Sequence, residues 1–309
     1  MSATENPGSG AEPMTATVAN AGAGDDEGAR LLAALGVAQG TAVSEPLPDD
    51  EADAEHFTPR AFVEYALSLH GRTLDEARLP STLIATFHAS VYRDLVAATN
   101  AEQAPQTPQE VMTVAQGKIG EQKVALRKLG VGAPAAVAVL EELVALGVRD
   151  ILVVGTAGSL QPGLPIGSFI VPTGAIREEG TSFHYAPAAS ELAPDATLAQ
   201  SLAEAVVELG GVVTFGQVWT TDAPYREVRS KIAAYSALGA LAVEMEASAL
   251  FALAQFRGVR LATLMAVSDE LFHEWRPGFH TAELRAAQKL TAQASLRAAA
   301  RLAEPPAGA

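Results

Sequence analysis

The amino-acid sequence predicts an α/β protein in which helices cover both faces of a mainly parallel or mixed sheet. Short apolar runs of strand length alternate along the chain with longer stretches whose apolar residues recur at helical spacing. Proline and glycine stand at element boundaries, as Pro134 and Gly147 do at the two ends of one predicted helix. Apolar residues make up 49% of the 309 residues, which is enough for an extended core.

The predicted elements begin after a segment of different composition. Roughly the first 50 residues are rich in Ala, Gly, Pro, Asp and Glu, so residues 1–55 are expected to form a disordered tail and residues 56–309 a single domain. Helices are expected at residues 58–70, 134–147, 198–209, 226–238, 246–257 and 281–302. Strands are expected at residues 82–87, 123–129, 151–154, 169–171, 212–219, 241–245 and 261–267.

Charge and composition exclude several classes of function. The formal net charge of −15 leaves no basic face for a phosphate backbone, so nucleic acid is not an expected partner. The chain has no cysteine and its six histidines show no metal-site spacing, so neither a thiolate nucleophile nor a bound metal is expected. It lacks a signal peptide and a run of about 18 apolar residues, which predicts a cytoplasmic protein without membrane contact.

In folds of this class ligands bind beyond the carboxyl ends of the strands, and one such end is rich in glycine. Here the chain reads Gly155-Thr156-Ala157-Gly158, so that backbone N–H groups and one hydroxyl can approach a phosphate or ribose oxygen. The alternative for this motif is a tight turn that needs positive φ at glycine.

Two further strand ends carry carboxylates. Glu244 and Glu246 flank Met245 where a strand gives way to a helix, and a carboxylate there can accept two hydrogen bonds from the vicinal hydroxyls of ribose. The alternative is acidic residues in a first helical turn, which the helix dipole favours. Asp269 ends an apolar strand and is either a general acid or a turn or cap residue.

Taken in order, these motifs resemble those of one enzyme family. The stretches 155–162 (GTAGSLQP), 167–172 (GSFIVP), 177–182 (REEGTS), 243–248 (VEMEAS) and 267–269 (VSD) follow one another as in the nucleoside phosphorylase and nucleosidase family. The resemblance covers residues 123–309. It implies a three-layer α/β/α phosphorylase-like fold with a central mixed sheet, and an enzyme that breaks the bond between sugar and base of a nucleoside.

The resemblance assigns roles around the sugar. Glu246 is similar to the glutamate that binds the ribose hydroxyls, Met245 to the residue that packs on the sugar, and Thr156 to the threonine between phosphate and ribose. Ala157, Gly158 and Glu244 belong to the same motifs and complete the sugar side of the predicted substrate site.

The resemblance also assigns roles around the base. Asp269 is similar to the aspartate that assists departure of a purine through its N7, which uridine phosphorylases lack, so a purine-type base is implied. Tyr225 falls at the place of the base-stacking aromatic residue, with Trp219 as a second candidate, and core packing is the alternative for both. Asp269 and Glu246 form the predicted catalytic pair.

The predicted phosphate site departs from the family pattern. The usual Gly-Asp-Pro-x-Arg loop is replaced over residues 86–93 by TFHASVYR, which keeps only Arg93, and Val153 stands where a second arginine usually precedes the Gly-Thr pair. We predict that Arg127 replaces it from a neighbouring strand, because a guanidinium grips phosphate in a bidentate fork. Lys128 is the alternative, and ordinary surface ion pairing is the other possibility. Thr156 completes the predicted phosphate site.

The leading hypothesis is a homo-oligomeric phosphorylase that uses inorganic phosphate as co-substrate and no other cofactor. A hydrolytic nucleosidase acting on a nucleoside or nucleotide is the alternative on the same fold, and a nucleoside-binding protein without catalysis is a third. A dinucleotide-dependent oxidoreductase is excluded, because no Gly-x-Gly-x-x-Gly opens a helix after a strand. His88 lies in the altered loop and is a candidate site residue, ahead of His184 and His273.

Overall fold

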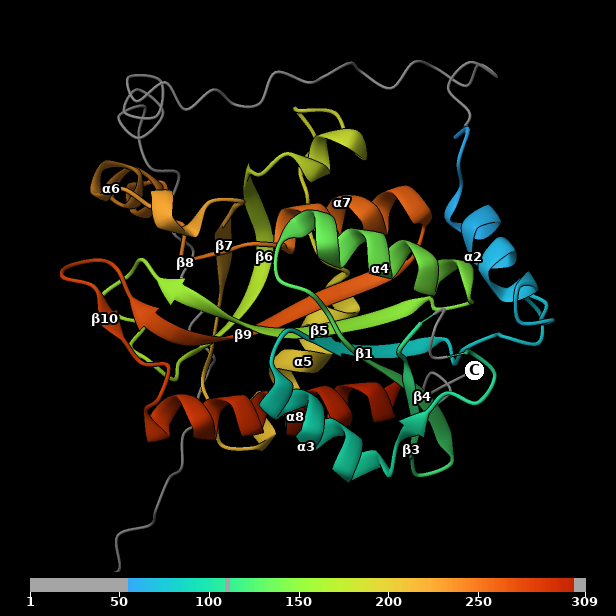
Figure 1. Ribbon diagram of the computed structural model, residues 1–309. Coiled ribbons are helices and arrows are strands. Elements are labelled where there is room, and N and C mark those ends of the chain that lie inside the picture. Colours follow the sequence, from blue (N-terminus) through green and yellow to red (C-terminus); the bar gives the residue numbers. More distant parts are fainter. Residues whose placement is uncertain (1–54, 109–111, 303–309) are drawn as a thin grey trace, which may run out of the picture.

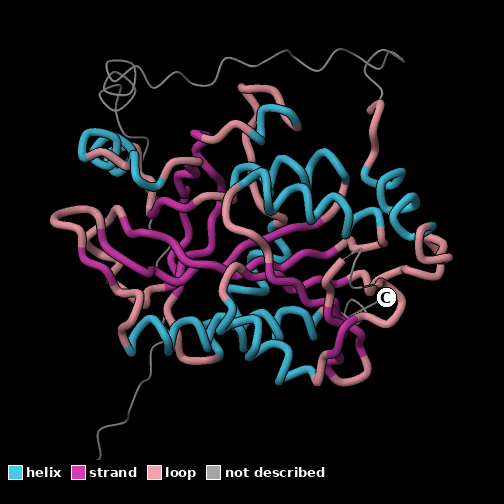
Figure 2. Tube along the Cα trace, viewed as in Figure 1, coloured by secondary structure: helices cyan, strands magenta, loops and turns pink. Residues whose placement is uncertain are grey.

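Helices flank a large sheet on two sides in the computed structural model, which describes residues 55–108 and 112–302 (Figures 1 and 2). This arrangement confirms the predicted α/β fold with a central mixed sheet. The predicted tail, residues 1–55, lies outside the described residues apart from Glu55. None of the described helices is both long and apolar enough to cross a membrane.

The sheet places strands that are distant in sequence beside one another. Its order is β10-β9-β6-β7-β8-β5-β1-β4-β3-β2, with a further pairing of β9 to β5. The strands are β1 (Thr82–Thr86), β2 (Glu102–Gln103), β3 (Ala115–Ile119), β4 (Gln122–Lys128), β5 (Asp150–Ser159), β6 (Phe169–Glu178), β7 (Val213–Thr221), β8 (Ala242–Glu244), β9 (Arg260–Glu270) and β10 (Arg276–Pro277).

The pairing of β9 to β5 closes part of the sheet on itself. Because β5 also pairs with β8, the strands β5, β9, β6, β7 and β8 form a closed circuit of hydrogen-bonded neighbours. β5 runs parallel to β1 and β9 and antiparallel to β8. The carboxyl ends of β5 and β9 therefore meet at the same edge, next to the end of β8.

Two helical layers bury the two faces of this sheet (Figure 1). One apolar cluster joins the sheet to α2 (Pro59–Ser68), α4 (Ala133–Ala145) and α7 (Ala247–Arg257). A second cluster joins the opposite face to α3 (Ala89–Thr99), α5 (Ala196–Glu208) and α8 (Ala282–Arg301). The remaining described helix, α6 (Arg229–Ala237), packs its Tyr235 ring on the fully buried Trp219 ring of β7, with ring centroids 4.3 Å apart.

Three strands extend further than the sequence predicts. β5, β6 and β9 continue beyond the predicted ends at residues 154, 171 and 267, because β5 keeps pairing with β9 as far as Ser159, and β6 with β7 as far as Glu178. Gly155 and Gly158 consequently lie inside β5 and have no positive φ, so the tight-turn interpretation of this motif is wrong. The predicted helix at residues 226–238 begins later, at Arg229, after a short 3₁₀ turn over Pro224–Arg226.

Candidate active site

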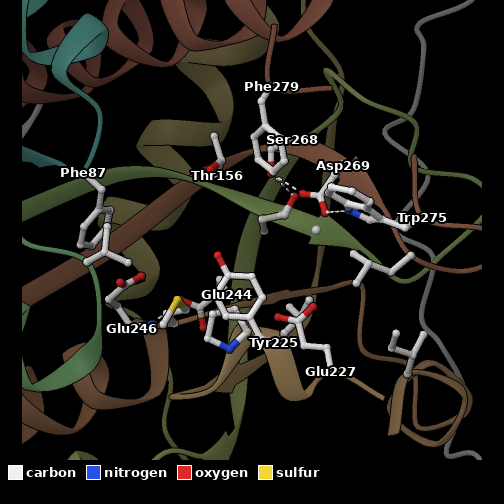
Figure 3. A pocket seen from close by; sticks show the side chains of 18 of the residues that line it. Phe87, Thr156, Tyr225, Glu227, Glu244, Glu246, Ser268, Asp269, Trp275 and Phe279 are labelled. Atoms are coloured by element: carbon white, nitrogen blue, oxygen red, sulfur yellow. Dashed lines mark hydrogen bonds between the residues drawn. The ribbon is translucent and has the colours of Figure 1, made fainter. Parts of the chain in front are cut away.

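A cavity of about 760 Å³ opens at the carboxyl ends of β5, β8 and β9. It contains eight of the ten residues in the predicted site, which are Thr156, Ala157, Gly158, Tyr225, Glu244, Met245, Glu246 and Asp269. In Figure 3 the glutamates of the β8 end lie on one side of this cavity, and Asp269 lies on the other. Four segments separated by many residues in sequence thus meet at one site, as the strand-end rule predicts.

Gly158 of β5 lies between the two sides of the site. It pairs with Val243 of β8 on one edge and with Asp269 of β9 on the other. The register between β5 and β9 shifts at Ala157 and Gly158, so that Ser268 is an extra residue opposite them. Bulges of this kind redirect side chains, and this one occurs next to Asp269, where a general acid was predicted.

A side chain at position 158 would require Leu271 to move. A Cβ added there would overlap the Leu271 side chain and would lie 3.4 Å from Oδ2 of Asp269. We expect Gly158→Ala to lower kcat/KM about tenfold and to destabilise the fold by about 1–3 kcal/mol through overpacking, measured by steady-state kinetics and thermal unfolding. Gly163→Ala is the matched control, because a Cβ there meets nothing within 4 Å. Equal behaviour of the two variants would contradict this account.

The Glu244 side chain is buried at the junction of β8 and α7 and accepts hydrogen bonds there. Its buried carboxylate accepts the Thr220 hydroxyl and the backbone N–H groups of Glu246 and Ala247, the latter two at 2.7 Å. These bonds occupy the carboxylate with protein donors and fix the start of α7. Glu244 therefore orients its neighbour Glu246, a positioning role that the sequence motif did not distinguish from direct substrate binding.

Glu246 stands at the N-terminal boundary of α7 and presents its carboxylate to the cavity. Its Oε1 accepts the backbone N–H of Gly132 at 2.5 Å, a glycine with φ of +99° that precedes α4. Burial raises the pKa of both Glu246 and Glu244, and repulsion from Glu244 raises the pKa of Glu246 further. Glu246 thus presents a buried carboxyl group to the cavity, with Oε1 held by the Gly132 N–H and its charged form disfavoured.

Asp269 has a donor on each of its carboxylate oxygens. The Ser268 hydroxyl donates to Oδ1 at 2.7 Å, and the Trp275 indole N–H donates to Oδ2 at 2.9 Å. Figure 3 shows the Trp275 ring beside Asp269, with Phe279 on the same side of the cavity. Asp269 belongs to β9, so the cap and turn interpretations of this residue are wrong.

The wall on the Asp269 side includes residues that sequence reasoning missed. Trp275 and Phe279 are 62% and 52% exposed and follow β9 in an irregular segment. Glu227 lies just after the 3₁₀ turn that carries the exposed Tyr225. These segments have no periodic apolar pattern that predicts their structure. The aromatic residues that follow Asp269 within ten positions were nevertheless a signal of a wall for a flat ligand. Trp219, the second predicted wall residue, is buried on Tyr235 and does not line the cavity.

His88 and Thr156 meet at another part of the lining. The His88 Nε2 lies 3.1 Å from the Thr156 hydroxyl, and burial lowers the pKa of His88, which favours the neutral imidazole. His273 also lines the cavity, whereas His184 does not. Through this contact the segment after β1, residues 86–93, lies against the glycine motif of β5, residues 155–158.

The two arginines of the predicted phosphate site lie elsewhere. Neither Arg93 nor Arg127 lines the cavity. Arg93 is exposed on α3, and the Arg127 guanidinium donates to the Thr113 carbonyl. The expectation that β4 lies beside β5 is wrong, because β1 separates the two strands. Phosphate binding by Arg93 or Arg127 stays a prediction that this geometry does not support.

Within the described part of the chain, no group of three or more His, Asp or Glu side chains is placed to hold a metal ion. The cavity lining instead combines carboxylates, two histidines and aromatic rings with one arginine, Arg229, which pairs with Glu274. Such a site suits a neutral ligand with hydroxyl groups and a flat ring.

Comparison with known proteins agrees with this geometry. The sequence pattern of the phosphorylase superfamily matches residues 87–304, which include every cavity residue. The chain belongs to the phosphorylase superfamily. This phosphorylase-superfamily protein is 36% identical over 162 residues to a uridine phosphorylase of Treponema pallidum, covering 49% of its own length and 63% of the relative. It is 34% identical over 142 residues to a guanosine phosphorylase of Halorubrum lacusprofundi, with shares of 46% and 59%.

Solved structures of the superfamily share the fold. The crystal structure of purine nucleoside phosphorylase from Toxoplasma gondii in complex with immucillin-H superposes with a TM-score of 0.66 at 22% identity, covering 74% of this chain and 93% of that one. The uridine phosphorylase of Vibrio fischeri gives a TM-score of 0.65, also at 22% identity, with shares of 73% and 94%. The chain spans about three fifths of the curated relatives it matches, and these relatives differ in the base that their names state.

Proposed function

We propose that this protein cleaves the N-glycosidic bond of a purine-type nucleoside and transfers the sugar to inorganic phosphate. The observation that supports this most is the placement of Glu246 and Asp269 on opposite sides of one cavity, with the glycine motif of β5 between them. A nucleoside presents two hydroxyls at one end and a basic ring nitrogen at the other, which matches these two carboxyl groups.

The proposed chemistry follows from where charge develops. As the bond between sugar and base breaks, positive charge grows on the sugar and negative charge on the base. Glu246 accepts the ribose hydroxyls, and its carboxylate then stabilises the charge that grows on the sugar. Asp269, when protonated, donates a hydrogen bond or proton to the departing base. Trp275 and Ser268 hold the Asp269 carboxyl in place for this step.

A second candidate function is hydrolysis on the same fold. It is favoured by the lining around His88 and Thr156, where phosphate would be expected, because the described cavity residues include only one arginine. The only arginine of that lining, Arg229, is paired with Glu274. A neutral His88 beside a hydroxyl suits water at least as well as a phosphate dianion.

Release of free base, followed with and without inorganic phosphate, tests both candidates. We expect purine nucleosides to yield free base and ribose 1-phosphate in phosphate buffer, with uridine cleaved more slowly. Equal rates in phosphate-free buffer, with free ribose as the product, would instead establish a nucleosidase. Tight binding of nucleosides without release of any base would establish a binding protein and contradict both proposals.

The same proposal includes a cytoplasmic homo-oligomer, in line with the resemblance noted in the sequence. Light scattering coupled to gel filtration measures the mass of the assembly directly. A monomer of 31.9 kDa at assay concentration would contradict the oligomer without affecting the proposed reaction.

A further inference from the structure

We propose that Thr263 positions a buried water molecule that donates a hydrogen bond to the Glu246 carboxyl from beneath the sugar site. This inference rests on the proposed function, because it assigns a partner to the carboxylate that binds the ribose hydroxyls. Thr263 acts through the water and does not touch the substrate, so its role is that of a positioning residue.

A second, much smaller cavity adjoins the active-site cavity. Its volume is about 10 Å³, which is about the space that one water molecule needs. It shares Thr156 and Glu246 with the large cavity, and Thr263 of β9 also lines it. Because Thr263 pairs with Val153 of β5, and Leu250 of the lining belongs to α7, the small cavity lies between the sheet and α7.

The Thr263 hydroxyl needs a hydrogen-bond partner at this place. The residue is 2% exposed, and among the residues that the structure describes its hydroxyl has no such partner. Leaving a buried hydroxyl unpaired is costly, so buried polar groups of folded proteins are normally paired with protein groups or with ordered water. A water in the small cavity supplies this partner.

The cavity also offers the water its other partners. A buried water typically makes about three hydrogen bonds. The Glu246 carboxyl binds the Gly132 N–H with Oε1, but a carboxylate has about four lone-pair sites and can accept further donors. Glu244, by contrast, already accepts three protein donors. The water therefore accepts the Thr263 hydroxyl and donates to Glu246 and to the Thr156 oxygen.

Apolar side chains form the rest of the lining. Phe87, Val153, Leu250 and Met265 surround the polar groups of the small cavity. Figure 3 shows Phe87 on the same side of the large cavity as Glu246. In such surroundings a hydrogen bond is stronger than in bulk water, and the water has no other polar groups to move to.

The electrostatics of Glu246 give this water a function. Burial, together with the Glu244 charge, raises the pKa of Glu246, whereas a hydrogen bond donated to the carboxylate favours its charged form. The titratable groups that act on this pair or line the cavity beside it are Glu179, Asp222, Glu244 and His88. None of these four supplies positive charge, because burial lowers the pKa of His88. A donor from water therefore helps to keep Glu246 ionised for the ribose hydroxyls.

The experiment follows kcat/KM for the best nucleoside from pH 6 to pH 9 in the wild type, Thr263→Val and Thr263→Ser. This profile reports the pKa values of the free enzyme. We expect Thr263→Val to move the midpoint that belongs to Glu246 upward by about half a pH unit, which lowers kcat/KM about threefold on the acid side and leaves the alkaline plateau unchanged. Thr263→Ser keeps the hydroxyl and should keep the wild-type midpoint.

Thr82→Val is the matched control. Thr82 is also a buried threonine of a strand, but it lines neither cavity, and its hydroxyl accepts the Gln122 side-chain amide. Its substitution should leave the midpoint of the profile unchanged. A wild-type midpoint in Thr263→Val, or an equal shift in Thr263→Ser or Thr82→Val, would overturn the role of Thr263 while the proposed reaction stands.

Thermal unfolding tests the water site without any substrate, so that it remains decisive if the wild type cleaves no nucleoside and the proposed function fails. We expect Thr263→Val to have a lower Tm than the wild type, with a difference that widens from pH 6 to pH 9 as Glu246 ionises without its donor. If the hydroxyl has no partner, its replacement by a methyl group should leave the Tm unchanged or raise it. That result overturns the inference, and a difference that stays constant with pH overturns the link to Glu246.

Discussion

Glu246→Gln is expected to lower kcat/KM for the best nucleoside by about 10-fold to 100-fold at alkaline pH, where Glu246 is ionised despite its raised pKa, because hydrogen bonds to a charged group contribute about 1.5–3 kcal/mol. The glutamine keeps an acceptor for the Gly132 N–H, so the junction with α4 is preserved. The loss should appear with every ribonucleoside, because all ribonucleosides present the same 2′ and 3′ hydroxyls. A variant with wild-type rate constants would contradict the assignment of Glu246 to the sugar.

The same substitution should stabilise the free protein at alkaline pH. Burial raises the pKa of Glu246 above its ordinary value of 4.5, so the folded state retains a proton that the unfolded state has lost. Stability from this group is complete below about 4.5 and declines as pH rises toward the folded-state pKa. Glu246→Gln cannot lose that proton. Its Tm should therefore exceed the wild-type Tm by more at pH 8 than at pH 5, which thermal unfolding at the two pH values measures.

Asp269→Asn is expected to slow cleavage of purine nucleosides by about 100-fold, because general acid catalysis typically contributes at least that much. Asparagine keeps an acceptor for either Ser268 or Trp275, so the local geometry should survive. The informative comparison uses nucleosides of graded leaving-group ability. Nucleosides whose base leaves readily need little help from an acid and should lose much less activity than inosine.

Two controls separate an acid role from a structural one. Trp275→Phe removes one donor to Asp269 while keeping an aromatic ring, and should have a smaller effect that also depends on the leaving group. Near-wild-type thermal stability of Asp269→Asn would show that the fold is intact. A uniform loss for good and poor leaving groups would mean that Asp269 only shapes the cavity.

Much of the fold follows from local patterns in the sequence. The alternation of apolar runs predicts the layers, and Pro134 and Gly147 correctly delimit the helix that precedes β5. What local patterns could not supply is the length of β5, β6 and β9. The residues that extend them, 155–159, 172–178 and 268–270, are mostly Gly, Pro, Ala, Ser and charged residues with little strand preference, and they are held as strands by partners that lie far away in sequence.

The same contrast explains which site residues could be predicted. Glu246, Thr156 and Asp269 belong to compact motifs at strand ends, so the strand-end rule locates them together. Glu227 and Trp275 come from irregular segments whose paths depend on tertiary packing. Arg127 was placed near the site on the assumption that consecutive strands are neighbours, but β1 lies between β4 and β5.

The site combines residues on the strands of the closed circuit β5, β9, β6, β7 and β8 with residues on connecting segments, and these two parts differ in local stability. Thr156, Glu244 and Asp269 belong to strands of that circuit, whose backbone amides should be among the slowest to exchange with deuterium. Tyr225, Glu227 and Trp275 lie on connecting segments outside it. If the protein acts as proposed, the connecting segments contact the base and the strands contact the sugar, so substitutions in the connecting segments change the accepted base while the sugar contacts stay in place.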